Sequence, residues 1–370
     1  MQRWGTECGW QVTSNKCLLR SCASIVLAAL LLLRAAPAEA EGKPEKLVSS
    51  PQPMAVHAEP ITSFDKLSSG RTRFGKLEWI GGVRLLTEDK MFGGLSGIAL
   101  DEDGAGFVAV SDAGLWLTGK LTYDNGRPTG MTNVRVGPLK ALDGSLLARD
   151  RDRDAEAVVL TDGTTARGRL LISFEQNHRI GAFDIGPDGV SAPKSYIRPD
   201  TRRGRMSALS GFEAIEVLRG GRYKGATIAF AERLHDAEGR HTGWLWAKGK
   251  WQPFSLTDIG GFDITEAAAL PDGGLMLLER RFRWTEGVKM RIRRIAASDI
   301  APGARLDGEV LLEATMAQAI DNMEGLAVHE DRNGALILTV LSDDNYNPAL
   351  QKTLLLQFRL EEETAKATAR

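Results

Sequence analysis

Cysteine is nearly absent from this chain. Its 370 residues include three cysteines, Cys8, Cys17 and Cys22, so everything after position 22 lacks a thiol. This excludes disulfides and thiolate chemistry from the longer part of the chain. Histidine is scarce as well, and the five histidines do not show the spacing of zinc motifs: His57, His178, His235, His241 and His329.

Long apolar runs are also missing. The most apolar stretch, residues 23–33, is shorter than the roughly 20 residues that span a bilayer. Basic residues precede it, and a small-residue sequence that ends at Ala40 follows it. This order is typical of a secretory signal peptide. We therefore expect residues 1–40 to be removed and the mature chain to be periplasmic or secreted, with no membrane partner. An uncleaved membrane anchor is the alternative.

The chain has little net charge of either sign. Lysine and arginine number 47 against 48 acidic residues, which gives a net charge of −1. This balance argues against a nucleic-acid partner. Residues 41–64 hold four prolines and little periodicity, so we expect a linker there. Residues 361–370 are polar and are expected to form a flexible tail, which leaves one domain at 65–360.

Helix signals are few, but β-hairpin signals repeat. Five segments share an opening residue, an apolar strand, a Gly- or Asp-containing turn and a second apolar strand. A period of 53 to 60 residues is typical of β-propeller blades. We predict an all-β propeller of five blades, with a sixth, poorly marked blade as an alternative. The opening positions are Ser96, Glu156, Glu213, Glu266 and Glu324.

The two ends of the domain complement each other. Residues 353–360 would form the third strand of the fifth blade, and no fourth strand follows them in sequence. Residues 76–86 form an apolar run before the first repeat, where they have no partner. Since closure removes exposed sheet edges, we predict that 76–86 completes the last blade and closes the ring.

Acidic residues both open and close these hairpins. The first residue of one strand and the last residue of the next lie side by side in an antiparallel hairpin, so two acidic rings are expected at one end of the ring. Crowded carboxylates require cations, and Ca²⁺ prefers oxygen ligands. The alternative is that these acids bond backbone amides and hold the blades together. The candidate metal ligands are Glu156, Glu175, Glu213, Glu232, Glu266, Glu279, Glu324, Asp343 and Asp344.

Arginines follow several closing acids. Arg179, Arg233 and Arg280 are candidates to steady a developing negative charge on a substrate. The alternating run 149–154 is interpreted as a solvated loop. Ser96 lies in a sequence that matches a nucleophile elbow only loosely.

Several of these motifs together resemble a known family. They are similar to segments of the bacterial phytase-like domain family, which is also called "esterase-like activity of phytase". The segments are FGGLSGIALDEDGAGFVAVSD, LLERRF, DNMEGLA and SDDNYNPALQKTLLLQF. The resemblance covers roughly 70–360 and implies a relation to β-propeller phytases, which are calcium-dependent phosphomonoesterases. It implies calcium at the acidic end of the ring and basic residues that hold phosphate.

Two functions remain open at this point. The first is an exported, calcium-dependent hydrolase of phosphoric or other small anionic esters. The second is a non-catalytic periplasmic propeller that binds a ligand or a protein, in which the acids pair with arginines.

Overall fold

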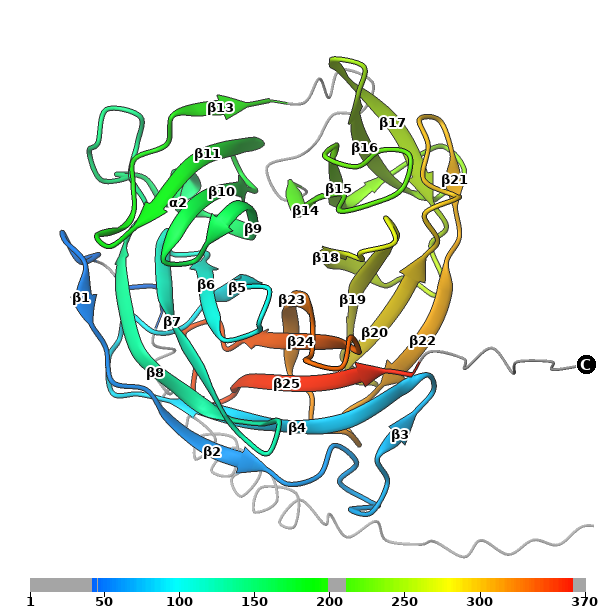
Figure 1. The fold of residues 1–370 in the computed structure, drawn as a ribbon, viewed down its shortest axis with the longest axis horizontal. Coiled ribbons are helices and arrows are strands. Elements are labelled where there is room, and N and C mark those ends of the chain that lie inside the picture. Colours follow the sequence, from blue (N-terminus) through cyan, green and yellow to red (C-terminus); the bar gives the residue numbers. More distant parts are fainter. Residues whose placement is uncertain (1–41, 45, 199–210, 362–370) are drawn as a thin grey trace, which may run out of the picture. The chain divides into compact units, whose positions relative to one another are not determined.

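The computed structural model describes residues 42–44, 46–198 and 211–361. The expected signal peptide and nearly all of the expected tail lie outside these residues. The described residues form one compact unit. Five antiparallel sheets are arranged around a centre as a five-bladed β-propeller (Figure 1), so the predicted fold class is confirmed.

The first three blades follow one another along the chain. The first holds β5 (Leu95–Leu100), β6 (Gly106–Ser111), β7 (Leu115–Asp124), β8 (Arg127–Pro138) and β1 (Gln52–Pro53). The second holds β9 (Ala155–Thr164), β10 (Arg167–Phe174), β11 (Arg179–Gly186), β12 (Gly189–Val190) and β13 (Ser195–Ile197). The third holds β14 (Phe212–Val217), β15 (Thr227–His235), β16 (His241–Ala247), β17 (Lys250–Leu256) and β21 (Arg305–Leu306).

The last two blades complete the ring. The fourth holds β18 (Asp263–Ala269), β19 (Leu275–Arg283), β20 (Gly287–Ile295) and β22 (Glu309–Ala314). The fifth holds β23 (Asn322–Glu330), β24 (Leu336–Asp343), β25 (Thr353–Leu360), β4 (Leu77–Leu86), β2 (His57–Ile61) and β3 (Arg73–Phe74). Among the described residues the one helix is α2 (Asp150–Arg153).

The ring closes through the two ends of the domain, as predicted. Strand β4 pairs antiparallel with β25, so that Leu85 faces Thr353 and Leu77 faces Leu360. Each innermost strand also contacts the next: β5, β9, β14, β18, β23 and then β5 again. The closed ring has five blades, so the alternative of a sixth blade is wrong.

The expected linker at 41–64 contributes to two blades. Strand β1 pairs with β8 at the outer edge of blade one, and β2 pairs with β4 at the outer edge of blade five. Proline is tolerated at such outer edges because a missing N–H there interrupts no ladder. The prolines suggested a linker, but proline also occurs in edge strands, so the proline content alone could not distinguish the two.

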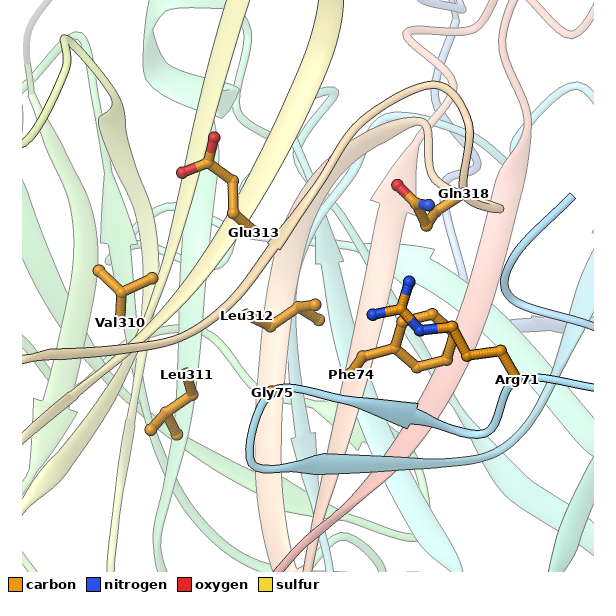
Figure 2. A pocket seen from close by; sticks show the side chains of 8 residues that line it. All are labelled: Arg71, Phe74, Gly75, Val310, Leu311, Leu312, Glu313 and Gln318. Carbon is orange, nitrogen blue, oxygen red and sulfur yellow. The ribbon is translucent and has the colours of Figure 1, made fainter. Parts of the chain in front are cut away.

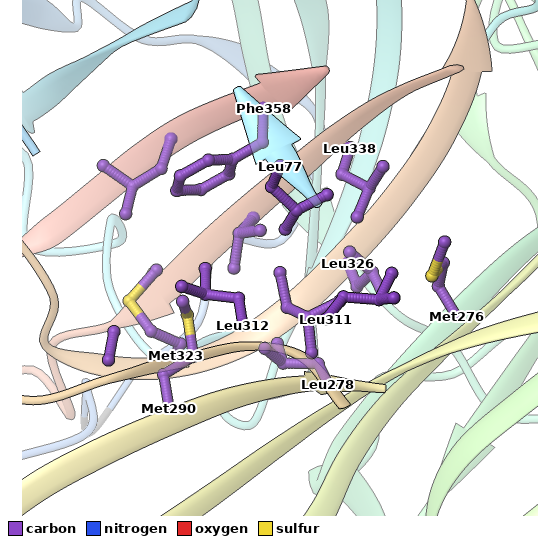
Figure 3. Packing of buried hydrophobic residues seen from close by; sticks show 14 of the residues in the cluster. Leu77, Met276, Leu278, Met290, Leu311, Leu312, Met323, Leu326, Leu338 and Phe358 are labelled. Atoms are coloured by element: carbon purple, nitrogen blue, oxygen red, sulfur yellow. The ribbon is translucent and has the colours of Figure 1, made fainter. Parts of the chain in front are cut away.

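The blades pack through alternating apolar side chains. Between blades four and five, Leu278, Met290, Met323 and Leu338 are completely buried and meet in one cluster (Figure 3). Strand alternation explains this arrangement, because every second residue of a central strand faces the neighbouring blade. The faces of the sheets are thus used for packing, and the strand ends are left for polar groups.

Candidate functional site

One position in each blade departs from regular strand pairing. Near its start, every innermost strand has an extra residue, and the register shifts there. Such a β-bulge re-aims the extra side chain. The bulge therefore sets which side chains point toward the end of the ring. The five bulge residues are Ser96, Glu156, Glu213, Thr265 and Glu324.

The fourth blade differs from the sequence alignment by one residue. Its bulge residue is Thr265, not Glu266, and the closing position shifts with it. Arg280 consequently stands where the other four blades carry an acid. A slip of one residue moves side chains to the opposite face of a strand. Blade four thus provides a hydroxyl and a cation where two carboxylates were expected.

The structure does not bring Glu266 or Glu279 to the other acids. Glu279 is buried and forms ion pairs with Arg291, at 3.5 Å, and with Arg293. Glu266 is buried, and one of its oxygens accepts a hydrogen bond from the Ala267 N–H at 3.0 Å. Burial raises the pKa of Glu266 well above its ordinary value. Glu266 and Glu279 therefore have their partners inside blade four.

Eight carboxyl groups from four blades gather at this end of the ring. Two sets of three have one carboxylate oxygen per residue within 4.8 Å of the others: Asp154, Glu156 and Glu175, and Glu175, Glu213 and Glu232. Glu175 belongs to both sets. Blades one and five complete the group, which we call the acid cluster: Asp112, Asp154, Glu156, Glu175, Glu213, Glu232, Glu324 and Asp343.

These carboxyls are poorly solvated and repel one another. Burial, followed by neighbouring negative charge, raises the pKa of Glu156, Glu213 and Asp343 well above the ordinary range. Burial raises the pKa of Glu175 and Glu232 to about 7. Without a bound cation, the acid cluster retains protons at neutral pH, because the closeness of the carboxyls and their desolvation both disfavour ionisation. A bound cation would reverse that preference.

Three basic side chains, Lys43, Arg233 and Arg280, offset part of the charge. Lys43 lies 3.0 Å from Asp112 and 3.2 Å from Asp154. Arg280 lies 3.1 Å from Glu324 and 3.6 Å from Glu232. The Asp112 pKa is nevertheless raised to about 7, because burial outweighs the nearby Lys43.

Comparison with known proteins agrees with this architecture. The model of the phytase-like family, described as esterase-like activity of phytase, matches residues 90–346. The chain belongs to the phytase-like family. No curated protein matches it. The matched residues of this phytase-like chain include every member of the acid cluster.

Asp344 connects blade five of the phytase-like domain to blade one. Its carboxylate accepts hydrogen bonds from the Gly94 N–H at 3.3 Å, the Tyr346 N–H at 3.1 Å and the Thr353 hydroxyl at 3.0 Å. The Tyr346 hydroxyl lies 2.6 Å from the Ser111 hydroxyl. Glycine is required at position 94, where φ is +59° and a Cβ would lie 2.4 Å from the Tyr346 ring. Asp344, one of the candidate metal ligands, is thus engaged in hydrogen bonds that fasten the seam of the ring.

Replacing Asp344 with alanine should destabilise the phytase-like domain strongly. Three buried or partly buried donors would lose their acceptor, so we expect the free energy of unfolding to fall by about 3 kcal/mol. Urea denaturation followed by tryptophan fluorescence measures this. Tyr346→Phe removes only a hydroxyl and should cost about 1 kcal/mol. Equal stability of D344A and the wild type would contradict the role of this seam.

The three candidate arginines of the phytase-like site have different surroundings. Arg233 is 54% exposed and pairs with Glu232 at 2.9 Å, so it is open to a ligand. Arg280 is enclosed by the acids. Arg179 is 3% exposed, stacks 3.8 Å above the Phe174 ring and donates to the backbone carbonyl of Asp152 in α2. The structure brings Arg233 and Arg280 to the acid cluster but not Arg179.

Three members of the site are absent from the candidates drawn from the sequence: Asp112, which closes the first hairpin, Asp154 and Lys43. Asp154 ends an alternating run that resembles a solvated loop, yet it is 5% exposed and accepts a hydrogen bond from Gln176 at 2.8 Å. Its place directly before the opening strand of blade two was the available signal. Lys43 lies in the segment expected to be a linker, where the sequence offers no signal.

One surface pocket lies apart from the acid cluster. A pocket beside blade four is lined by Phe74, Leu311, Leu312 and Glu313, among others (Figure 2). Glu313 already pairs with Arg291 at 2.9 Å, and none of the cluster acids lines this pocket.

Within the described part of the chain, no helix is long and apolar enough to cross a membrane.

Proposed function

We propose that this phytase-like propeller is an exported, calcium-dependent hydrolase of phosphoric or related anionic esters that acts at the acid cluster. The observation that carries the proposal is the charge imbalance of the acid cluster, in which eight carboxyl groups outnumber the lysine and arginine side chains beside them. Family membership and the apolar run before Ala40 support the activity class and the export.

The residues of the cluster suit calcium. Their donors are all carboxylate oxygens, and Ca²⁺ takes six to eight oxygens at about 2.3–2.6 Å. One oxygen of Asp112 is buried and has no hydrogen-bond partner within the described residues, as expected of an atom that awaits a cation. Calcium would be held by the two sets that share Glu175, with Asp112, Glu324 and Asp343 around them.

The chain's own groups can do the remaining work. When bound, calcium would polarise a phosphoryl oxygen and make a bound water more acidic. Exposed Arg233 would bind the substrate anion, because a guanidinium matches phosphate geometry.

A substrate screen tests this function. We expect phosphomonoester hydrolysis that requires calcium and disappears with a calcium chelator, measured by phosphate release. Carboxylic esters tested in parallel distinguish a phosphatase from a general esterase. Calcium binding without turnover of any ester would favour the alternative, a propeller that binds a ligand or protein. Absence of both would overturn the proposal.

Lys43 should compete with calcium. Its ammonium group lies 3.0 Å from Asp112 and 3.2 Å from Asp154, so a metal must displace it or share these acids. We expect Lys43→Met to tighten calcium binding about tenfold, which is the effect of about 1.4 kcal/mol. Isothermal titration calorimetry measures this.

Lys46 provides the matched control. It is exposed and lies three residues further along the same segment, so Lys46→Met should leave calcium affinity unchanged. Weaker binding in Lys43→Met would instead show that the lysine organises the acids for the metal.

A further inference from the structure

Two histidines lie side by side at one end of blade three, where β15 ends and β16 begins. His235 ends β15 and His241 begins β16, and the two residues are cross-strand partners. Their rings are 4.6 Å apart. Asp258, just after β17, has an oxygen 4.0 Å from the Nε2 atom of His235. One ligand atom from each of the three residues lies within 4.8 Å of the others.

His241 is unusual within this group. It is 1% exposed, and neither of its ring nitrogens has a hydrogen-bond partner within the described residues. A buried imidazole normally satisfies at least one nitrogen, because an unpaired polar atom away from water is costly. One of these nitrogens lies within 4.8 Å of a ring nitrogen of His235 and a carboxylate oxygen of Asp258, so an ion that accepts its lone pair could bind between the three residues.

From this geometry we infer that His235, His241 and Asp258 form a binding site for a transition-metal ion of the zinc type, separate from the acid cluster. Two imidazoles and one carboxylate are a donor set that zinc prefers and calcium does not. Three protein ligands leave a fourth tetrahedral position for water.

The arrangement needs only a small adjustment to bind the ion. Zinc–ligand distances of about 2.0–2.2 Å place ligand atoms about 3.4 Å apart. His235 is exposed and can close the present 4.0 Å separation from Asp258. Asp258 is already oriented, since its other oxygen accepts a hydrogen bond from the Gly261 N–H at 2.7 Å. Such an anchored carboxylate is typical of metal ligands.

The charges around His241 are compatible with a cation. The groups that face it are His235, Asp258, Asp263 and Arg293. Arg293 forms an ion pair with Glu279, which compensates its charge. Burial, followed by the charge of His235, lowers the pKa of His241 to about 4, so this imidazole is neutral and able to coordinate at neutral pH.

Bound zinc would fix the β15–β16 hairpin. Strand β15 also carries Arg233, which pairs with Glu232 at 2.9 Å and with Asp263 at 3.2 Å. A metal that joins both strands of this hairpin to the loop after β17 would hold Arg233 beside the acid cluster. The site thus stabilises one rim of the propeller and does not depend on the chemistry at its centre.

Zinc titration of the full chain tests this inference. His235→Ala and Asp258→Asn remove ligands that are exposed or partly exposed, so both variants should fold, unlike substitutions of buried His241. We expect each variant to lose roughly 10- to 100-fold in zinc affinity, measured by competition with a zinc indicator. Cobalt offers a second readout, because a tetrahedral site gives strong visible absorption that both variants should lose.

Two controls separate this site from the acid cluster. His57→Ala removes an exposed histidine on blade five and should bind zinc and cobalt as the wild type does. Glu175→Gln weakens the acid cluster and should also leave the zinc site intact. Zinc affinity that falls in Glu175→Gln but not in His235→Ala would overturn the inference, as would unchanged affinity in both ligand variants.

Discussion

Without divalent metal, the melting temperature of the protein should fall as the pH rises from 5 to 8. The pKa values of Asp112, Glu175 and Glu232 are raised to about 7 in the folded chain, whereas unfolded carboxyls titrate near pH 4. Between these values the folded state retains protons that the unfolded state has lost. Stability present below about pH 4 is therefore lost as the pH rises through 7.

The size of this effect follows from proton linkage. Each proton retained only by the folded state lowers the free energy of unfolding by about 1.4 kcal/mol per pH unit. For these three carboxyls we expect the melting temperature to drop on the order of 10 °C over this range. Calorimetry in a chelating buffer measures the drop.

Calcium should remove this pH dependence. The ion binds ionised carboxylates, so its affinity rises over the same pH range in which the metal-free protein loses stability, and ligand binding stabilises the folded state. At pH 8, saturating calcium should restore the melting temperature to its value at pH 5 or above. A melting temperature that responds neither to pH nor to calcium would show that arginine and lysine already neutralise the cluster.

The sequence predicted the ring far better than it predicted the members of the site. Closure of the propeller by 76–86 followed from unpaired edges, a constraint that leaves few solutions. The alternation of apolar residues extends over whole strands, so a single residue that departs from it does not change the predicted strand. These features involve many residues each, which is why they could be inferred without coordinates.

The site depended on single residues, and there the prediction failed in blade four. Glu266 follows Thr265, and Glu279 precedes Arg280, so an alignment that seeks acids settles one residue away from the true register. A bulge is set by backbone geometry, which the sequence does not display. Asp344 was misplaced for a different reason: its oxygens suit a metal, but the Gly94 and Tyr346 N–H groups donate to one of them and the Thr353 hydroxyl donates to the other.

Glu175→Gln should therefore weaken calcium binding more than any other single change in the acid cluster. Glu175 contributes to both sets of three acids, with Asp154 and Glu156 on one side and Glu213 and Glu232 on the other. Glutamine keeps the size of the side chain but removes the charge. We expect a loss of at least about 100-fold in calcium affinity, or about 2.8 kcal/mol, measured by isothermal titration calorimetry near pH 8.

Glu266→Gln is the matched control, because the sequence repeat treats Glu266 as an equivalent acid. The structure buries it within blade four, with the Ala267 N–H at 3.0 Å as its partner. It is not a member of either set of three. Calcium affinity should then stay within about twofold of the wild type, a difference below about 0.5 kcal/mol. Because burial raises the Glu266 pKa well above its ordinary value, the neutral amide should also be tolerated. Equal losses in the two variants would restore the ring of acids expected from the sequence, whereas a loss confined to Glu175→Gln would establish the register that the bulges define.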